Sequence, residues 1–179
     1  MIKISLLLVS LFFTCTTVMA APLQVGDVAP DWSFKEATDA SFTMASWPDK
    51  VLLINYVDPD ESELNEPFNE AMRAARESGL LLDTDYMGLG IVDCAATWKP
   101  DVLIRSIAGS KAEQYKRTVL FDYDATLRKA WDLKEDSANI ILLDKNHVVR
   151  YISRGKIDDE QIASVVQMAI DLQTGNHGQ

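Results

Sequence analysis

KVLLINYVDPDESELNEPF, residues 50–68, decides the fold of this chain. Residues 51–56 are apolar except for Asn55, which is typical of a central β-strand covered on both faces. An acidic turn follows, and a helical pattern begins beyond it. Asp60 and Glu63 would form a capping box at the start of that helix. In the alternative, Pro67 lies in the first helical turn and Asn65 is the cap.

The remaining elements follow in an order that is typical of α/β proteins. Residues 86–92 and 118–121 predict two more buried strands, and residues 125–131 predict a short helix with Asp124 as its cap. Residues 95–110 show only one possible helical turn. A hairpin at 139–143 and 148–152 and a helix from Asp158 complete the chain. The order predicts an α/β, thioredoxin-like fold, with a central mixed β-sheet flanked by helices and a C-terminal β-hairpin and helix.

The first twenty residues predict a secretory signal peptide. Lys3 precedes an apolar stretch at residues 4–13, and VMA at 18–20 has the small residues that signal peptidase reads. We expect cleavage after Ala20, a periplasmic location, and one domain over residues 21–179 with a disordered tail at 174–179. A retained anchor is the alternative, but the apolar run is shorter than the ~20 residues that span a bilayer. FFT before Cys15 is a poor lipid-attachment motif.

The net charge and the number of cysteines limit which partners the protein can bind and whether it can form a disulfide. The formal net charge of −10 disfavours nucleic acid and anionic membranes as partners. After signal cleavage, Cys94 would be the one remaining cysteine, so no intramolecular disulfide can form.

Several short motifs in the second half of the chain together resemble the YtfJ family of exported bacterial proteins. They are IVD at 91–93, FDYD at 121–124, AWDL at 130–133, and DSA at 136–138 followed by ILLDK at 141–145. The resemblance rests on their order and spacing over about eighty residues. It implies a thioredoxin-like fold and an exported protein, and it supplies no catalytic residues or cofactor.

The positions that carry redox chemistry in this fold class are altered. Redox-active members have two cysteines after the first main strand, where Glu61 and Leu64 stand here, and neither residue can act as a thiolate. Such proteins also have a cis-proline before the third main strand. Spacing from Asp144 places Ala138 there, and we expect a trans peptide because a cis bond before a non-proline residue costs ~3 kcal/mol. The sequence therefore predicts no dithiol oxidoreductase activity.

Cys94 is the one candidate catalytic thiol. It follows a strand rather than beginning a helix, and the neighbouring Asp93 would raise the pKa of its thiol. We expect Cys94 to be a buried small hydrophobic residue. The alternative is a single-cysteine thiol oxidoreductase or peroxidase that uses Cys94.

The other candidates belong to a binding surface. Redox proteins of this fold bind extended peptides at the loop after the first main strand and at the proline loop. Trp98 is either part of the core or an exposed aromatic anchor. The acidic turn lacks the glycine of a calcium loop, so we expect helix capping there rather than a metal site, and no cofactor. The predicted binding surface, at the positions where redox proteins of this fold bind peptides, consists of Asp58, Asp60, Glu61, Glu63, Ser137, Ala138 and Trp98.

These observations predict an exported thioredoxin-like protein that lacks the redox pair. Its expected role is a non-redox binding or accessory module, with a periplasmic protein or peptide as partner. The enzyme that would use Cys94 is the alternative.

Overall fold

The computed structural model describes residues 21–115 and 117–175. The predicted signal peptide at residues 1–20 lies outside the described residues, and so do residues 176–179 of the predicted tail. Thr174, which we expected in that tail, still ends a helix. The chain leaves helical geometry at Gly175, whose φ of 75° is left-handed and costs a glycine little.

The described residues form a mixed sheet of seven strands. These are β1 (Ser33–Lys35), β2 (Ser41–Thr43), β3 (Val51–Val57), β4 (Tyr86–Asp93), β5 (Thr118–Asp122), β6 (Ala138–Leu143) and β7 (Val149–Arg154). Their order across the sheet is β2-β1-β5-β4-β3-β6-β7. β3 runs parallel to β4 and antiparallel to β6, and β4 runs parallel to β5. The predicted strands and hairpin are confirmed, and so is the α/β class with a central mixed sheet flanked by helices.

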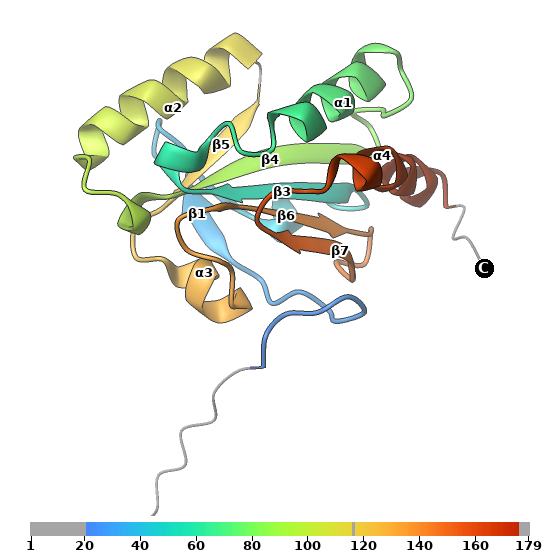
Figure 1. Ribbon diagram of the computed structural model, residues 1–179, viewed down its shortest axis with the longest axis horizontal. Helices are drawn as coiled ribbons and strands as arrows, with labels where there is room; N and C mark the ends of the chain where they lie inside the picture. The colour runs from blue at the N-terminus through green and yellow to red at the C-terminus, as the bar shows by residue number, and fades with distance from the viewer. Residues whose placement is uncertain (1–20, 116, 176–179) are drawn as a thin grey trace, which may run out of the picture.

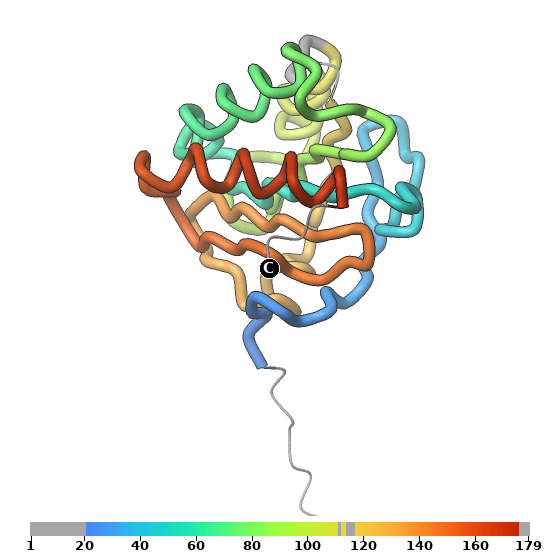
Figure 2. Tube along the Cα trace, turned by 90° about the vertical axis from the view of Figure 1, so that its right-hand side faces the viewer, coloured from blue at the N-terminus to red at the C-terminus, as the bar shows by residue number. Residues whose placement is uncertain are grey.

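Helices cover both faces of the sheet. The helices α1 (Glu66–Glu77), α2 (Asp101–Tyr115) and α4 (Asp159–Thr174) lie over one face, whereas α3 (Thr126–Trp131) and the segment before β1 lie over the other (Figures 1 and 2). α1 contacts α4, and α2 contacts β5. Within the described part of the chain, every helix is too short or too polar to cross a bilayer.

The two faces of β3 supply two separate parts of the core, because side chains alternate along a strand. Leu52 and Ile54 are fully buried on the α3 side, where they pack with Trp131. Val51 and Leu53 are buried on the other side, beneath α1 and α4. β3 is therefore the central strand that its continuous apolar run predicts.

Helix α1 begins later than the capping-box prediction places it. Asp58, rather than Asp60, caps the acidic turn by accepting a hydrogen bond from Asp60 N at 2.8 Å, and a 3-10 turn, Pro59–Glu61, follows. α1 then starts at Glu66 with Asn65 at its cap position. Because Pro67 lies in the first turn, the missing backbone N–H disrupts no helical hydrogen bond.

Helix α3 is capped by a residue other than the predicted Asp124. Asp122, at the end of β5, accepts hydrogen bonds from the backbone N–H groups of Thr126 and Leu127, at 2.8 Å each. The chain reaches this position through Ala125, whose φ of 52° is left-handed. A carboxylate outside the ordinary cap position therefore satisfies the first N–H groups of α3.

The segment that showed no clear pattern contains α2. Its apolar side chains do not form one buried stripe: Ile104 is buried, whereas Val102, Leu103 and Ile107 are exposed. This distribution weakens the helical periodicity on which sequence reasoning depends.

Candidate functional site

The structure brings the parts of the predicted binding surface together at the carboxyl end of β3. The backbone N–H of Asp58 donates to the carbonyl of Ser137 at 2.9 Å, which joins the acidic turn to the segment before β6. On the other side, Lys99 forms an ion pair with Asp60 and lowers the pKa of that carboxyl group. Trp98 precedes Lys99, so the tryptophan lies at the same edge of the sheet.

Burial nevertheless removes three of the predicted residues from that surface. Asp58, Ser137 and Ala138 are 4%, 3% and 1% exposed, and burial raises the pKa of Asp58. Trp98 is 88% exposed, which decides between the two interpretations of this residue in favour of the exposed one. The accessible members of the predicted set are Asp60, Glu61, Glu63 and Trp98.

The two positions expected to carry redox cysteines lie ahead of α1. Glu61 ends the 3-10 turn, and Leu64 lies two residues before Glu66, the first residue of α1. The peptide bond before Ala138 is trans, as every described peptide bond is. The local backbone therefore does not place a side chain at position 61 or 64 in the first turn of α1, where the helix dipole would lower a thiol pKa.

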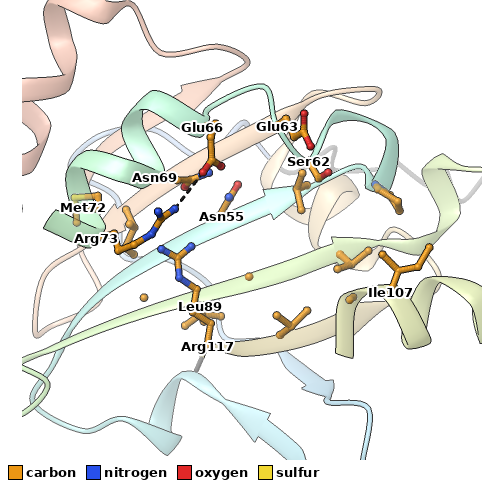
Figure 3. A pocket seen from close by; sticks show the side chains of 18 of the residues that line it. Asn55, Ser62, Glu63, Glu66, Asn69, Met72, Arg73, Leu89, Ile107 and Arg117 are labelled. Atoms are coloured by element: carbon orange, nitrogen blue, oxygen red, sulfur yellow. Dashed lines mark hydrogen bonds and ion pairs between the residues drawn. The ribbon is translucent and has the colours of Figure 1, made fainter. Parts of the chain in front are cut away.

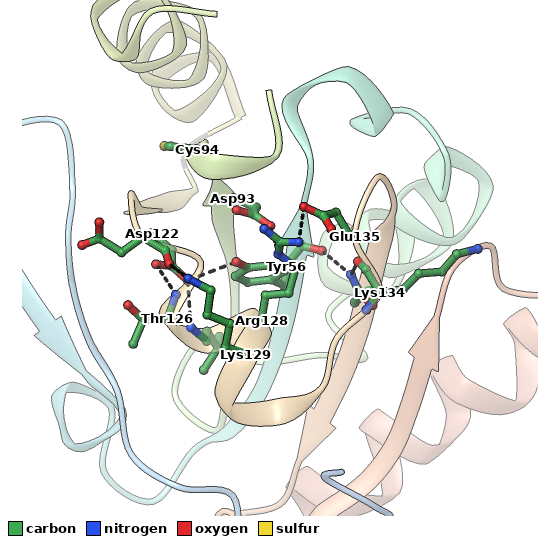
Figure 4. A network of polar contacts seen from close by, with 12 residues as sticks. Tyr56, Asp93, Cys94, Asp122, Thr126, Arg128, Lys129, Lys134 and Glu135 are labelled. Carbon is green, nitrogen blue, oxygen red and sulfur yellow. Dashed lines mark hydrogen bonds and ion pairs between the residues drawn. The ribbon is translucent and has the colours of Figure 1, made fainter. Parts of the chain in front are cut away.

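Cys94 is buried, as expected, and forms part of a small apolar cluster with Val92, Ile104 and Phe121 beneath α2. Burial first, and then the negative charges of nearby aspartates, Asp101 foremost among them, raise the pKa of its thiol to about 12. Figure 4 shows Cys94 projecting away from Asp93. The thiol therefore lies in an environment that disfavours ionisation.

A large cavity opens between α1 and α2 over strands β3, β4 and β5. Its volume is about 570 Å³, within the range of about 300–1,000 Å³ that small-molecule sites occupy. We call it the α1–α2 cavity. Gly88 and Gly90 form part of its floor on β4, and Asn55 projects into it from β3 (Figure 3). Its apolar wall residues include Leu53, Val57, Met72, Ile104, Ile107 and Val119.

Three arginines line this cavity. Arg73 pairs with Glu66 at 3.1 Å, and Arg76 pairs with Asp83 at 2.9 Å. Arg117 extends from the start of β5 toward Arg73 (Figure 3). Burial lowers the pKa of Arg117, and the charges of Arg73 and Arg76 lower it further. The cavity thus gathers three arginines in an acidic protein, with Glu63 and Glu66 also in its lining.

A second polar cluster lies on the opposite face, where β3, β4 and β5 end. Arg128 Nε lies 2.8 Å from Asp93 Oδ2, and the same guanidinium forms an ion pair with Glu135. Beside this pair, Tyr56 Oη donates to Asp122 Oδ2 at 3.0 Å (Figure 4). Burial raises the pKa of both Tyr56 and Asp93. We call this cluster the Arg128 network; its guanidinium is paired with two carboxylates, although Asp93 Oδ1 has no hydrogen-bond partner among the described residues.

Sequence reasoning missed both the cavity and the network, although each left a signal. Two glycines inside a buried strand, at positions 88 and 90, indicate a place where something approaches the backbone closely. Asp93 and Asp122 each end a parallel strand, and the carboxyl ends of such strands meet at one edge of a sheet. No group of three or more His, Cys, Asp or Glu residues in the described ranges could hold a metal ion.

Comparison with solved structures shows the thioredoxin-like fold at low sequence identity. A candidate protein disulfide isomerase from Bacteroides thetaiotaomicron is 20% identical with a TM-score of 0.64, and the match covers 85% of this chain and 91% of that one. A thiol peroxidase from Chromobacterium violaceum is 18% identical with a TM-score of 0.60, over 89% and 92% of the two chains. An exposed lipoprotein thioredoxin from Streptococcus pneumoniae is 15% identical with a TM-score of 0.59, over 78% and 99%. At these identities the likeness shows the fold alone.

No curated protein matches the chain significantly. A comparison with protein-family models, in contrast, identifies a family. A family model described as "Bacterial protein of unknown function (YtfJ_HI0045)" matches residues 31–172, which confirms the resemblance seen in the sequence. The chain therefore belongs to the YtfJ_HI0045 family of bacterial proteins.

Proposed function

We propose that this protein is an exported, non-redox binding module that keeps the thioredoxin-like frame without its thiol chemistry. The observation that carries the proposal is the environment of Cys94, which is buried and whose pKa is raised to about 12. The thiolate is the reactive form of cysteine, and such a thiol is almost entirely protonated at neutral pH. Glu61 and Leu64 offer no replacement nucleophile.

The alternative is a single-cysteine oxidoreductase or peroxidase. Such an enzyme needs a local field that favours the thiolate. Arg105 is the cation that acts to lower the pKa of Cys94, but burial and the charges of Asp101, Asp93 and Asp122 outweigh it. The electrostatic environment of Cys94 therefore argues against thiol catalysis.

Three assays on the purified protein test the proposal. We expect no acceleration of dithiothreitol-driven insulin reduction and no consumption of hydrogen peroxide. Iodoacetamide should label the Cys94 peptide rapidly only after unfolding in guanidinium chloride, as read by mass spectrometry. Turnover of insulin or peroxide that Cys94→Ser abolishes would overturn the proposal in favour of the enzyme.

Export is tested separately. Protein recovered from the periplasmic fraction should begin at Ala21, as measured by intact mass. Lys3, the apolar run and VMA at residues 18–20 support this expectation. An intact Met1, or a diacylglyceryl group on Cys15, would contradict it.

A further inference from the structure

The floor of the α1–α2 cavity is open at Gly90 on β4, whereas the side chain of Tyr86 covers Gly88, where a Cβ would lie 2.8 Å from Tyr86 Oη. A Cβ on Gly90 would meet only Val119 Cγ2, at 3.8 Å, which is an ordinary contact. A side chain could therefore stand at this position without a clash with its surroundings. Glycine inside a strand weakens it and often marks the close approach of a ligand.

Arg117 forms no ion pair with any described residue, although the charge of Glu66 partly offsets its own. None of the described residues places a carboxylate within ion-pair distance of this guanidinium, in contrast to Arg73 and Arg76. The residues outside the description contain no Asp or Glu, so they add no side-chain carboxylate that could pair with it. In a chain of net charge −10, a half-buried arginine beside two others is a local exception. An anion in the cavity would relieve this repulsion.

Asn55 supplies a second unsatisfied group. Its Oδ1 is buried at the cavity and has no hydrogen-bond partner in the described part of the chain. Buried polar atoms are almost always hydrogen-bonded, and exceptions call for an explanation. An acceptor in the cavity next to an unpaired guanidinium fits a ligand that carries a negative group and a hydrogen-bond donor.

We propose that the α1–α2 cavity binds an amphiphilic organic anion, with its negative group on the guanidinium of Arg117 and its apolar body against Gly90 and the apolar walls. The planar guanidinium binds carboxylate and phosphate oxygens in a bidentate manner. A hydroxyl or amide on the ligand would donate to Asn55 Oδ1. This assignment rests on the proposed binding function and names the ligand class and the site.

Titration calorimetry with three matched probes tests the charge requirement. Dodecanoate and dodecyl phosphate represent the two anionic groups, and dodecanol is the neutral control of the same chain length. We expect at least one of the two anions to bind about 10-fold or more tightly than dodecanol. Equal affinity for the three probes, or no binding of either anion, would overturn the proposal.

Two substitutions test the site. Arg117→Met should weaken binding of the anion about 10-fold or more and leave dodecanol unchanged, whereas Gly90→Leu should weaken both by filling the floor. Lys156→Met, which removes an exposed positive charge on the loop before α4, should change neither. Wild-type affinity in Arg117→Met would overturn the assignment.

A measurement without any substitution covers the case in which Gly90→Leu fails to fold. Titration of the wild-type protein, followed by amide NMR, should shift the signals of Gly88, Gly90 and Asn55 first. Shifts confined to other parts of the chain would place the ligand elsewhere and overturn the assignment. If the anions fail to bind and insulin and peroxide are not turned over, the site is wrong and the non-redox role stands. Cys94-dependent turnover would overturn the proposed function whatever the ligand result.

Discussion

Two partly buried arginines on opposite faces of the sheet differ in whether a carboxylate of the protein pairs with their charge. Arg128 pairs with Asp93 and Glu135 beneath α3, in the Arg128 network. Arg117 lines the α1–α2 cavity and has no carboxylate partner among the described residues. The positive charge of Arg128 is paired with carboxylates of the protein itself. The positive charge of Arg117 has no such partner among the described residues and could pair with a ligand. Satisfied networks support structure, and uncompensated groups in a cavity indicate binding.

The largest expected effect separates these two arginines by stability. Arg128→Met should lower the free energy of unfolding by ~3–5 kcal/mol, because it leaves the carboxylate of Asp93, which is 2% exposed, without its partner. Arg117→Met should cost less than ~1 kcal/mol, because it strands no carboxylate. Urea titration of both variants measures the difference. Equal losses would mean that Arg117 has a structural role after all.

The packed part of the core gives the next largest effect. Leu52→Ala or Ile54→Ala should each cost ~2–5 kcal/mol, since both side chains are fully buried on the α3 side of β3. Ile107→Ala, at a cavity residue that is 48% exposed, should cost less than ~1 kcal/mol. A loss below ~1 kcal/mol for Leu52→Ala would show that β3 is not the packing centre.

A smaller effect tests the cap of α3. Asp122→Ala should cost ~1–3 kcal/mol, because Thr126 and Leu127 lose an acceptor for their N–H groups and Tyr56 Oη loses its own. Asp124→Ala should stay within ~0.5 kcal/mol, as expected of an exposed residue. Thermal unfolding compares the two, and the reverse order would restore Asp124 as the cap.

The smallest effect concerns Cys94 and pH. The pKa of the folded thiol is raised to about 12 from an ordinary value of 9.0, so the unfolded chain releases this proton first as pH rises. The stability that Cys94 contributes is therefore present below about pH 9 and is lost toward about pH 12. Alkylation of the native thiol should still be rising at pH 10, as followed by mass spectrometry. A plateau near neutral pH would reveal a stabilised thiolate.

Some of the candidate site was readable from the chain. Glu61 and Leu64 stand where cysteines would be needed, and the count of two cysteines shows that Cys94 has no partner for dithiol exchange once residues 1–20 are removed. The sequence also indicated that the acidic turn and the Ser137 segment come together. It did not show that Asp58 and Ser137 are buried, because their burial depends on which other elements of the fold pack over them.

The sequence by itself determined the frame of this protein. The apolar run at β3 requires cover on both faces, and the order of strands and helices then leaves few topologies. Only the tertiary structure decided where a cavity forms in this fold and which residues line it. The α1–α2 cavity depends on Gly90 of β4 lying between α1 and α2, with Arg117 placed beside it from the position just before β5. These residues come from separate parts of the chain, and no local pattern encodes their distance, because packing between elements sets it.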